Sequence, residues 1–220
     1  MRQQQVYAFS GLGADARAFA ALELPGYEMI HVEWVQPQPA EPLAAYVLRL
    51  AQQAGIPKSG AFVIGLSFGG ICATELSKSY TFKKLLLISS AKTQQELPSF
   101  FGFAKILPLH KLIPAKFFTM PSAFLNRMFA VHEIADQRLL AAIIRDTDPQ
   151  FMKWAIQAML DWDNKLMPAN CLHIHGDKDR VIPINSIRNA VPIQGAGHFM
   201  ILNRASEISP RIVDFFASSL

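Results

Sequence analysis

The sequence predicts an α/β fold with a mostly parallel sheet of about six strands flanked by helices, and three observations support this class. Short apolar runs rich in β-branched and aromatic residues alternate with helical patterns along most of the chain, which is typical of α/β proteins. The runs are apolar at nearly every position, as expected for strands buried on both faces. The 220 residues, 51% hydrophobic and 17% charged, suffice for one domain with a large core and exclude disordered and fibrous classes.

The expected strands are short and buried. They comprise residues 6–9, 29–32, 62–64, 85–88, 172–174 and 190–193. Between them, apolar residues repeat with the spacing of one helix face in the segments 42–54, 152–159 and 208–216. A further helix is expected to start directly after the third strand.

Residues 92–147 interrupt this alternation, because they contain no convincing strand and prolines divide them into short helical pieces. The segment also holds seven of the 16 phenylalanines. We interpret it as a helical cap, or lid, inserted into a core formed by residues 1–91 and 148–220; any single phenylalanine is as readily explained as ordinary core. The phenylalanines expected to contact a substrate are Phe100, Phe101, Phe117, Phe118 and Phe124.

Other features exclude several functional classes. No apolar stretch reaches the roughly 20 residues that span a bilayer, and the first apolar run is too short for a secretory signal, so a cytoplasmic location is expected. Cys72 and Cys171 lack the spacing of a disulfide framework or a zinc site, and we expect both to be buried and inert. The net charge of +4 comes from scattered basic residues, which argues against nucleic-acid binding.

The strongest local motif is Gly65-x-Ser67-x-Gly69, which follows an expected strand and precedes an expected helix. A serine at such a tight turn must adopt strained backbone angles, and the glycines let strand and helix pass without Cβ clashes. Ser67 is therefore a candidate nucleophile presented at a helix amino terminus. The alternative interpretation is a glycine-rich packing turn with an incidental serine.

A serine hydroxyl needs a base to take its proton, and the base needs an orienting acid. Among the six histidines, only His198 lies in a glycine-rich loop directly after the last expected strand. An acidic loop follows the fifth strand and offers two aspartates, Asp177 and Asp179. One of these is expected to have a structural, loop-capping role.

The order serine, aspartate, histidine and the motif around Ser67 resemble the α/β-hydrolase superfamily, and this resemblance extends over nearly the whole chain. The superfamily often has a G-x-x-D-x-x-x-P pattern after its penultimate strand, which matches Gly176, Asp179 and Pro183. The resemblance therefore implies that Asp179 is the triad acid and Asp177 its neighbour. It also implies the α/β-hydrolase fold, with the insertion at the position of the family's lid.

The same resemblance implies an oxyanion hole made by the backbone N–H groups of Phe68 and Leu12. Ser10 stands where the family usually has histidine, which leaves open how the loop after the first strand is anchored. Two further departures suggest a trimmed family member. The chain begins at what would be the family's third strand, and the short segment between Asp179 and His198 leaves room for only a turn or two of helix at 185–188.

The expected function is that of a carboxylesterase-like serine hydrolase acting on a small-molecule ester with an apolar acyl or alcohol part. Neither a metal nor an organic cofactor is required for this chemistry. A thioesterase or lactonase using the same triad is an alternative, as is a non-catalytic ligand receptor with the hydrolase fold. Pairing with other chains is left open by the sequence.

Three patterns point to rival classes. Gly11-x-Gly13-x-x-Ala16, followed by Glu33, fits a dinucleotide-binding fingerprint, but little room remains for the helix that it needs. The stretch 173–177 is similar to the start of a binuclear zinc site, but a lysine follows where a third histidine is needed; two histidines filling one strand face explain it better. The basic, aromatic segment 97–132 suits a lipid surface, although an ordinary apolar lid with solvated lysines is the favoured interpretation.

Overall fold

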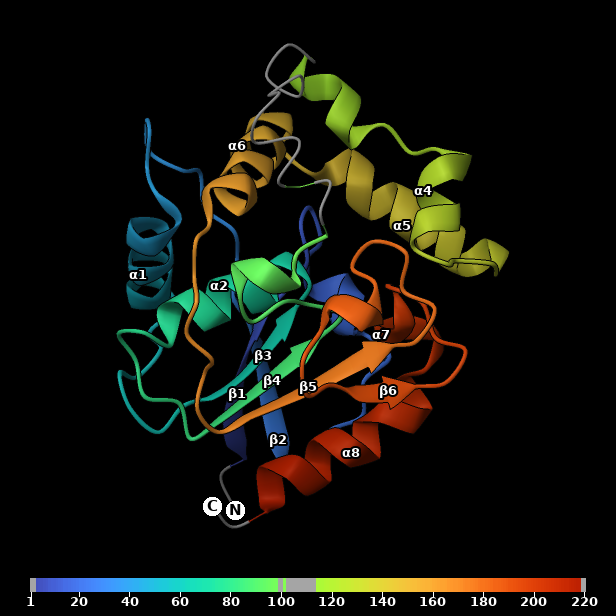
Figure 1. Ribbon diagram of the computed structural model, residues 1–220. Helices are drawn as coiled ribbons and strands as arrows, with labels where there is room; N and C mark the ends of the chain where they lie inside the picture. The colour runs from blue at the N-terminus through green and yellow to red at the C-terminus, as the bar shows by residue number, and fades with distance from the viewer. Residues whose placement is uncertain (1–2, 99–100, 102–113, 219–220) are drawn as a thin grey trace.

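A six-stranded parallel sheet forms the centre of the computed structural model, which describes residues 3–98, 101 and 114–218 (Figure 1). The order of the strands is β2-β1-β3-β4-β5-β6, and every neighbouring pair is parallel. Their bounds are β1 Gln4–Phe9, β2 Tyr27–His31, β3 Phe62–Leu66, β4 Lys84–Ile88, β5 Cys171–Gly176 and β6 Val191–Ile193. All six predicted segments overlap with these strands, which confirms the predicted fold class.

Helices follow the strands along the chain. The described α-helices are α1 (Leu43–Gln53), α2 (Phe68–Leu76), α4 (Ala123–Met128), α5 (Ile134–Asp146), α6 (Pro149–Asp161), α7 (Met200–Asn203) and α8 (Ala205–Ala217). The described 3-10 helices are η1 (Ala16–Phe19), η2 (Gln94–Glu96), η4 (Ala115–Thr119) and η5 (Ile184–Ser186). Helices were predicted at 42–54, 152–159 and 208–216, and α1, α6 and α8 confirm them.

The sheet is apolar on both faces because successive strand residues point to opposite sides. Tyr7 and Phe9 of β1 belong to one core cluster, which α1, α2 and α6 complete. Val6 and Ala8 belong to a second cluster, which α5 and α8 complete. The two clusters explain why these strands have nearly continuous hydrophobicity in the sequence.

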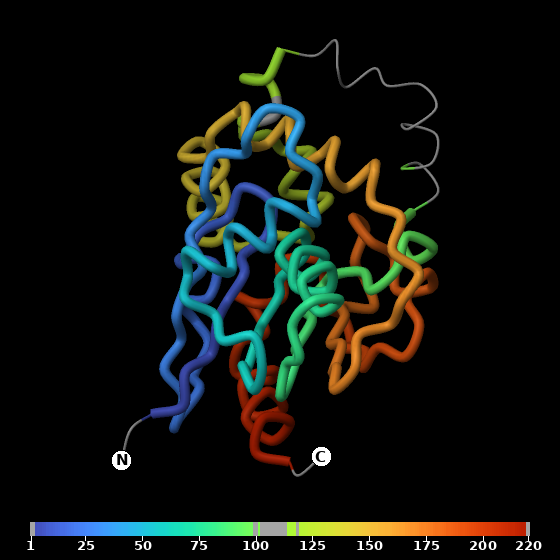
Figure 2. The backbone as a smooth tube through the Cα atoms, turned by 90° about the vertical axis from the view of Figure 1, so that its left-hand side faces the viewer, coloured from blue at the N-terminus to red at the C-terminus, as the bar shows by residue number. Residues whose placement is uncertain are grey.

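Helices η4, α4, α5 and α6 lie together beyond the carboxyl ends of the strands, and α8 runs toward the opposite end of the molecule (Figures 1 and 2). The described part of segment 92–147 forms helices and no strand, as predicted, but α5 is not a short piece: its 13 residues equal the length of α6 and of α8. Helix α6, which the sequence places in the core, contacts η4. The division of the chain into a core and a cap stays a prediction.

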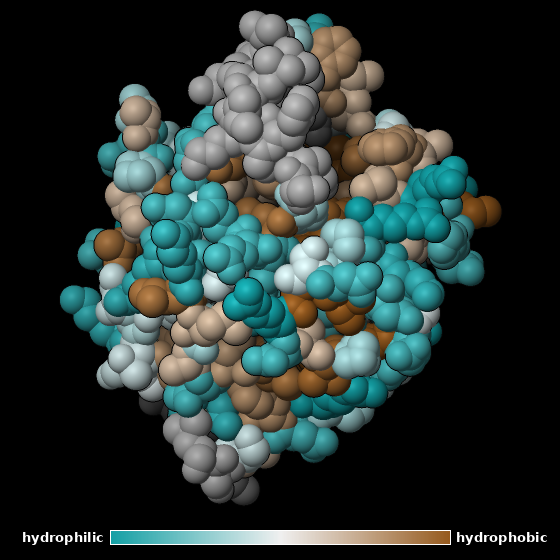
Figure 3. Space-filling view, viewed as in Figure 1, coloured by the Kyte–Doolittle hydropathy of each residue, from teal (hydrophilic) through white to brown (hydrophobic). Residues whose placement is uncertain are grey.

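Several large apolar side chains at this helical end are exposed, and hydrophobic surface is visible there in Figure 3. They are Phe117, Met120, Phe124 and Ile134. Among the described helices, none is long and apolar enough to cross a membrane.

Both cysteines are free thiols. Cys72 is buried as predicted, whereas Cys171, at the start of β5, is only half-buried. Burial raises the pKa of the Cys72 thiol well above its ordinary value and that of Cys171 to about 12. Thiols with such raised pKa values have little nucleophilic thiolate near neutral pH.

Candidate active site

Ser67 lies at a sharp turn between β3 and α2. Its backbone angles, φ 50° and ψ −118°, are strained for a residue with a side chain. The turn is tight enough that a Cβ on Gly69 would collide with the carbonyl oxygens of Ser10 and Phe9, and one on Gly65 would collide with Gly70. The structure therefore contains the strand-to-helix turn that the glycine pattern predicts.

Three side chains from three loops are hydrogen-bonded in series. His198 Nε2 lies 2.9 Å from Ser67 Oγ, and His198 Nδ1 lies 2.7 Å from Asp179 Oδ2. Ser67 follows β3, Asp179 follows β5 and His198 follows β6. Because the carboxyl ends of parallel strands meet at one edge of the sheet, residues far apart in sequence converge there. This arrangement suits proton transfer from the serine hydroxyl to the imidazole.

The Asp179 carboxylate is buried, and both of its oxygens accept hydrogen bonds. Its Oδ1 accepts the backbone N–H groups of Val181 and Ile182 at 2.8 and 2.9 Å. Burial alone would raise the pKa of Asp179, but attraction to His198 and hydrogen bonds from His175 and His198 outweigh it and hold that pKa well below its ordinary value. Asp179 is therefore ionised at neutral pH.

Asp177, the competing aspartate, has other partners. Its Oδ1 accepts the backbone N–H of Gly195 at 2.7 Å, and Lys178 Nζ lies 3.7 Å from its Oδ2. Asp177 thereby fixes the loop that carries His198 and has the structural role expected for one of the pair.

The loop after β1 lies beside Ser67. A Cβ on Gly11 would come within 3.5 Å of Ser67 Cβ, and Gly11, Leu12 and Phe68 line one cavity together with Ser67. This places the two segments predicted to supply the oxyanion hole next to the candidate nucleophile. Which N–H groups would bind an oxyanion stays a prediction.

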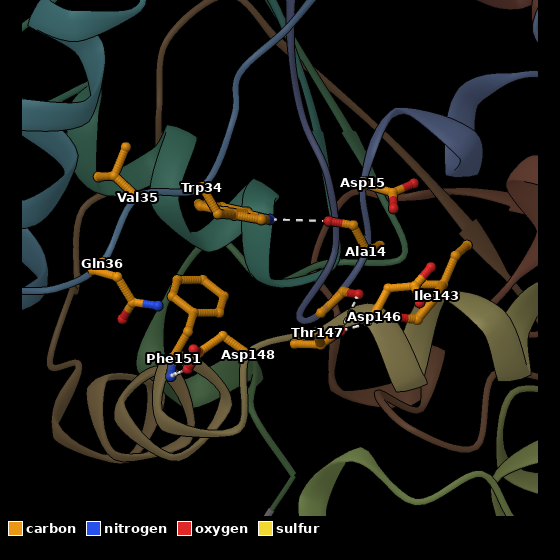
Figure 4. A pocket seen from close by; sticks show the side chains of 11 residues that line it. Ala14, Asp15, Trp34, Val35, Gln36, Ile143, Asp146, Thr147, Asp148 and Phe151 are labelled. Carbon is orange, nitrogen blue, oxygen red and sulfur yellow. Dashed lines mark hydrogen bonds between the residues drawn. The ribbon is translucent and has the colours of Figure 1, made fainter.

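The structure answers how this loop is anchored without the family's histidine. Ser10 Oγ donates to Ala14 O at 2.6 Å, and Trp34 Nε1 donates to both Ser10 Oγ (2.9 Å) and Ala14 O (3.1 Å; Figure 4). From the segment between α5 and α6, Thr147 Oγ1 donates to Gly13 O at 2.6 Å. Ser10, Trp34 and Thr147 thus replace the missing histidine as anchors of the loop.

An apolar cavity of about 110 Å³ opens beside Ser67 and His198. These two residues have the only polar side chains among the described residues that line it. The other lining residues are Gly11, Leu12, Ala14, Leu66, Phe68, Ile71, Leu97, Phe101, Phe129, Leu140, Ile143, Ile144, Met159, Val181, Ile182 and Phe199. A substrate group that enters this space meets hydrocarbon on nearly every side.

The five phenylalanines predicted to contact substrate lie in different places. Phe101 lines the cavity. Phe117 and Phe124 do not line it; these residues are 53% and 68% exposed on the outer surface of the helical end. Phe100 and the side chain of Phe118 lie outside the described residues.

Phe129 lines the cavity although it was not chosen among the expected contacts. Its ring meets the His198 ring edge-on, with the centroids 5.1 Å apart. Periodicity and composition offered no reason to prefer it over the other phenylalanines of the insertion.

A second cavity of about 220 Å³ lies behind the anchored loop (Figure 4). Three aspartates line it, but each has a structural partner: Asp15 and Asp146 both bind Arg17, and Asp148 caps α6 by accepting the N–H of Phe151. Within the described residues, no three histidine, cysteine, aspartate or glutamate side chains are grouped closely enough to hold a metal ion.

The structure also brings together residues that the sequence interpretation left aside. His173 and His175 on β5, with Lys92 from the loop after β4, form a buried polar chain behind Asp179. Their alternation in the strand was a signal that they share one face, but their partners come from other segments.

Comparison with protein families gives a match over most of the chain. The model of the family described as "Alpha/beta hydrolase family" matches residues 4–210. The chain belongs to the alpha/beta hydrolase family. Comparison with curated protein sequences yields no match.

Solved structures of alpha/beta hydrolases share this fold. An esterase from Exiguobacterium antarcticum has a TM-score of 0.73 and 17% identity, covering 98% of this chain and 92% of that one. An enol-lactonase from Burkholderia xenovorans LB400 has a TM-score of 0.71 and 17% identity, covering 99% and 93%. A bromoperoxidase from Bacillus anthracis has a TM-score of 0.66 and 17% identity, covering 99% and 93%. At this identity the likeness concerns the fold alone.

The rival dinucleotide-binding interpretation fails on the local structure as well. The segment after Gly13 forms only η1, a 3-10 helix of four residues. A dinucleotide fold needs a longer helix there, because its amino terminus binds the pyrophosphate.

Proposed function

We propose that this alpha/beta hydrolase cleaves carboxylic esters through an acyl-enzyme formed on Ser67. The observation that carries the proposal is the hydrogen-bonded series Ser67–His198–Asp179 at the mouth of an apolar cavity. Each member has the partner that its role requires: a nucleophile beside a base, and a base beside a buried carboxylate.

In the first half-reaction, His198 Nε2 accepts the hydroxyl proton as Ser67 Oγ attacks the ester carbonyl carbon. Asp179 holds the Nδ1–H tautomer of His198 and stabilises the imidazolium that forms. The negative oxygen of the tetrahedral intermediate accepts the backbone N–H groups of Phe68 and Leu12, next to the positive end of the α2 dipole. His198 then gives its proton to the leaving alcohol.

In the second half-reaction, a water molecule donates its proton to His198 Nε2 and attacks the acyl carbon. The new tetrahedral intermediate collapses, the bond to Ser67 Oγ breaks, and the imidazolium returns the proton to the serine. The carboxylic acid leaves and the starting state is restored.

The apolar lining supports an ester with an apolar acyl or alcohol part, because a charged group in this cavity would lose its hydration without a partner. Thioesterase and lactonase activities use the same three side chains and differ in the substrate that fits. A receptor without turnover is the remaining alternative.

The proposal is tested with p-nitrophenyl esters of two to eight acyl carbons, matched thioesters and lactones. We expect the intact protein to hydrolyse esters, with kcat/KM rising from acetate to butyrate or hexanoate. Ser67→Ala is expected to lower turnover by about 10⁴-fold or more, while Ser77→Ala, a serine at the far end of α2, keeps it. Preference for thioesters or lactones would redirect the proposal within the same triad, and turnover that survives Ser67→Ala would contradict it.

A further inference from the structure

A continuous chain of buried polar side chains leads away from the candidate catalytic acid. His175 Nε2 lies 3.2 Å from Asp179 Oδ2 and 2.8 Å from the carbonyl oxygen of Ile182. His175 Nδ1 lies 3.1 Å from His173 Nε2, and His173 Nδ1 lies 2.9 Å from Lys92 Nζ. The chain joins the ends of β4 and β5 beneath the site.

Every member of this chain is buried, with at most 5% of its surface exposed. Lys92 Nζ has three partners for its three N–H groups: His173 Nδ1, Arg188 O at 2.5 Å and Glu96 Oε1 at 3.3 Å. A buried ammonium is costly unless it is paired and hydrogen-bonded in this way. Burial of the Lys92 ammonium therefore costs folding free energy, as expected for a charged group that is kept for a specific role.

Elementary hydrogen-bond chemistry fixes the direction of the chain. An ammonium group only donates, so His173 Nδ1 accepts from Lys92. Burial, with Lys92 and His175 adding to it, holds the pKa of His173 well below its ordinary value, so this ring is neutral and its proton resides on Nε2. His173 then donates to His175 Nδ1, and the proton of His175 resides on Nε2, where both neighbours are acceptors, Ile182 O and Asp179 Oδ2.

One contact opposes this direction. The backbone N–H of Ser90 lies 3.5 Å from His173 Nε2, and a strong bond there would need a lone pair on that nitrogen. The proton of His173 would then reside on Nδ1, which faces the Lys92 ammonium, and His175 Nδ1 would have to donate to His173 Nε2. The distance is at the limit of hydrogen bonding, whereas the 3.1 Å contact between the two imidazoles is within the usual range. The two arrangements predict different tautomers.

We propose that Lys92, His173 and His175 are positioning residues that direct an N–H at the Asp179 carboxylate and hold it in the orientation His198 needs. The inference rests on the proposed function only for its effect on turnover. With the His175 N–H in place, Asp179 Oδ2 accepts hydrogen bonds from both His175 and His198, while Oδ1 accepts two backbone N–H groups. The carboxylate has no freedom to rotate away from the base.

The titratable groups in and around this chain come from five segments. Lys92 lies in the loop after β4 and Glu96 in η2; Cys171 lies at the start of β5, and the loops after β5 and β6 carry Asp179 and His198. An N–H directed at Asp179 withdraws negative charge from the carboxylate, so its loss strengthens the attraction between Asp179 and a protonated base. Variants that break the chain therefore shift the acid limb of the pH–rate profile to higher pH.

The first test does not depend on turnover. In protein with ¹⁵N-labelled histidine, chemical shifts report which ring nitrogen carries a proton, and His173→Gln and His175→Gln variants assign the signals. We expect His173 and His175 to be neutral with the proton on Nε2. A proton on Nδ1 of either ring, or on both nitrogens of His175, would overturn the proposal.

The second test compares two replacements of His175 on an ester that the intact protein hydrolyses. His175→Leu is expected to lower kcat about tenfold, leave KM within twofold, and shift the acid limb upward by about half a pH unit. His175→Gln retains an N–H near the position of Nε2 and is expected to restore most of kcat. His132→Leu, at an exposed histidine, is the control with unchanged kinetics.

A third variant guards against loss of folding, because removal of the Lys92 side chain alone would leave the buried Glu96 carboxylate without its cationic partner. The double variant Lys92→Met, Glu96→Gln removes both charges and is expected to change the pH profile in the same direction as His175→Leu. Normal kcat and an unshifted pH–rate profile in both variants would overturn the positioning role of the chain while leaving the proposed function intact. If the tautomers are as stated but no ester is hydrolysed, the proposed function fails and the arrangement of the chain stands.

Discussion

The hydroxyl of Thr147 lies 2.6 Å from the carbonyl oxygen of Gly13 and thereby ties the segment between α5 and α6 to the loop beside Ser67. A Cβ on Gly13, whose φ is 71°, would collide with Thr147 and Met152, so the two segments are in close contact. This bond lets the helical end of the molecule determine the position of Leu12.

Thr147→Val is expected to lower kcat by up to about tenfold, because one hydrogen bond that fixes the loop is lost and its net worth is about 1 kcal/mol. Thr81→Val, at an exposed threonine far from the loop, is the matched control and should keep kcat. Steady-state kinetics on one ester measure kcat for the two variants and the intact protein. Equal kcat for both variants and the intact protein would mean that the loop holds its position without Thr147.

Trp34→Phe is expected to lower both stability and kcat. The indole N–H is shared between Ser10 Oγ and Ala14 O, and its loss frees the other end of the same loop. Trp154→Phe removes an equivalent bond, the one to Glu41 O, so it should cost a similar 1 kcal/mol or so of stability with little change in kcat. Urea unfolding and kinetics on the same preparations separate the two effects, and equal losses of kcat would contradict a specific role for Trp34.

Phe129→Ala is expected to lower kcat/KM for hexanoate more than for acetate. The Phe129 ring forms a wall of the cavity next to His198, and its removal takes apolar contact from the longer chain. Phe215→Ala, on α8 at the other end of the molecule, is the control for loss of a ring. An unchanged ratio between the two esters would show that the acyl chain does not occupy this cavity.

Asp179 makes stability depend on pH in a defined direction. Its folded-state pKa is depressed, so its stabilising effect is fully present above the unfolded-state pKa of about 3.9 and is lost as the pH falls below that value. Asp179→Asn is therefore expected to unfold more readily than the intact protein at pH 7, and the difference should shrink as the pH falls from 4 to 3. Thermal unfolding across this range measures it, and a constant difference would contradict the ionised, hydrogen-bonded state.

The fold was predictable because its signals are local. Each strand has its own apolar run, and α1, α6 and α8 have their own helical spacing, so no knowledge of distant contacts was needed. Ser67 and its turn were predictable for the same reason, since the glycines that the turn requires lie within two positions of the serine. Asp179 and His198 required the chain order of a known family in addition.

The contacts that support the site were not predictable, because they join residues that only the fold brings together. The sequence gives no reason to pair Ser10 with Trp34, since the contact depends on the strand order that places β2 beside β1. In the same way, period-two spacing indicated that His173 and His175 share a face, but their link to Lys92 depends on the pairing of β4 with β5. The exposed position of Phe124 likewise reflects how short helices pack, which composition does not determine.

Covalent labelling tests the central claim most directly. The intact protein is incubated with a fluorophosphonate probe, and the modified residue is located by peptide mass spectrometry. The geometry around Ser67 Oγ predicts a single adduct on Ser67, much slower labelling in His198→Ala and none in Ser67→Ala. An adduct on another residue, or no adduct on the folded intact protein, would contradict the assignment of Ser67 as an activated nucleophile.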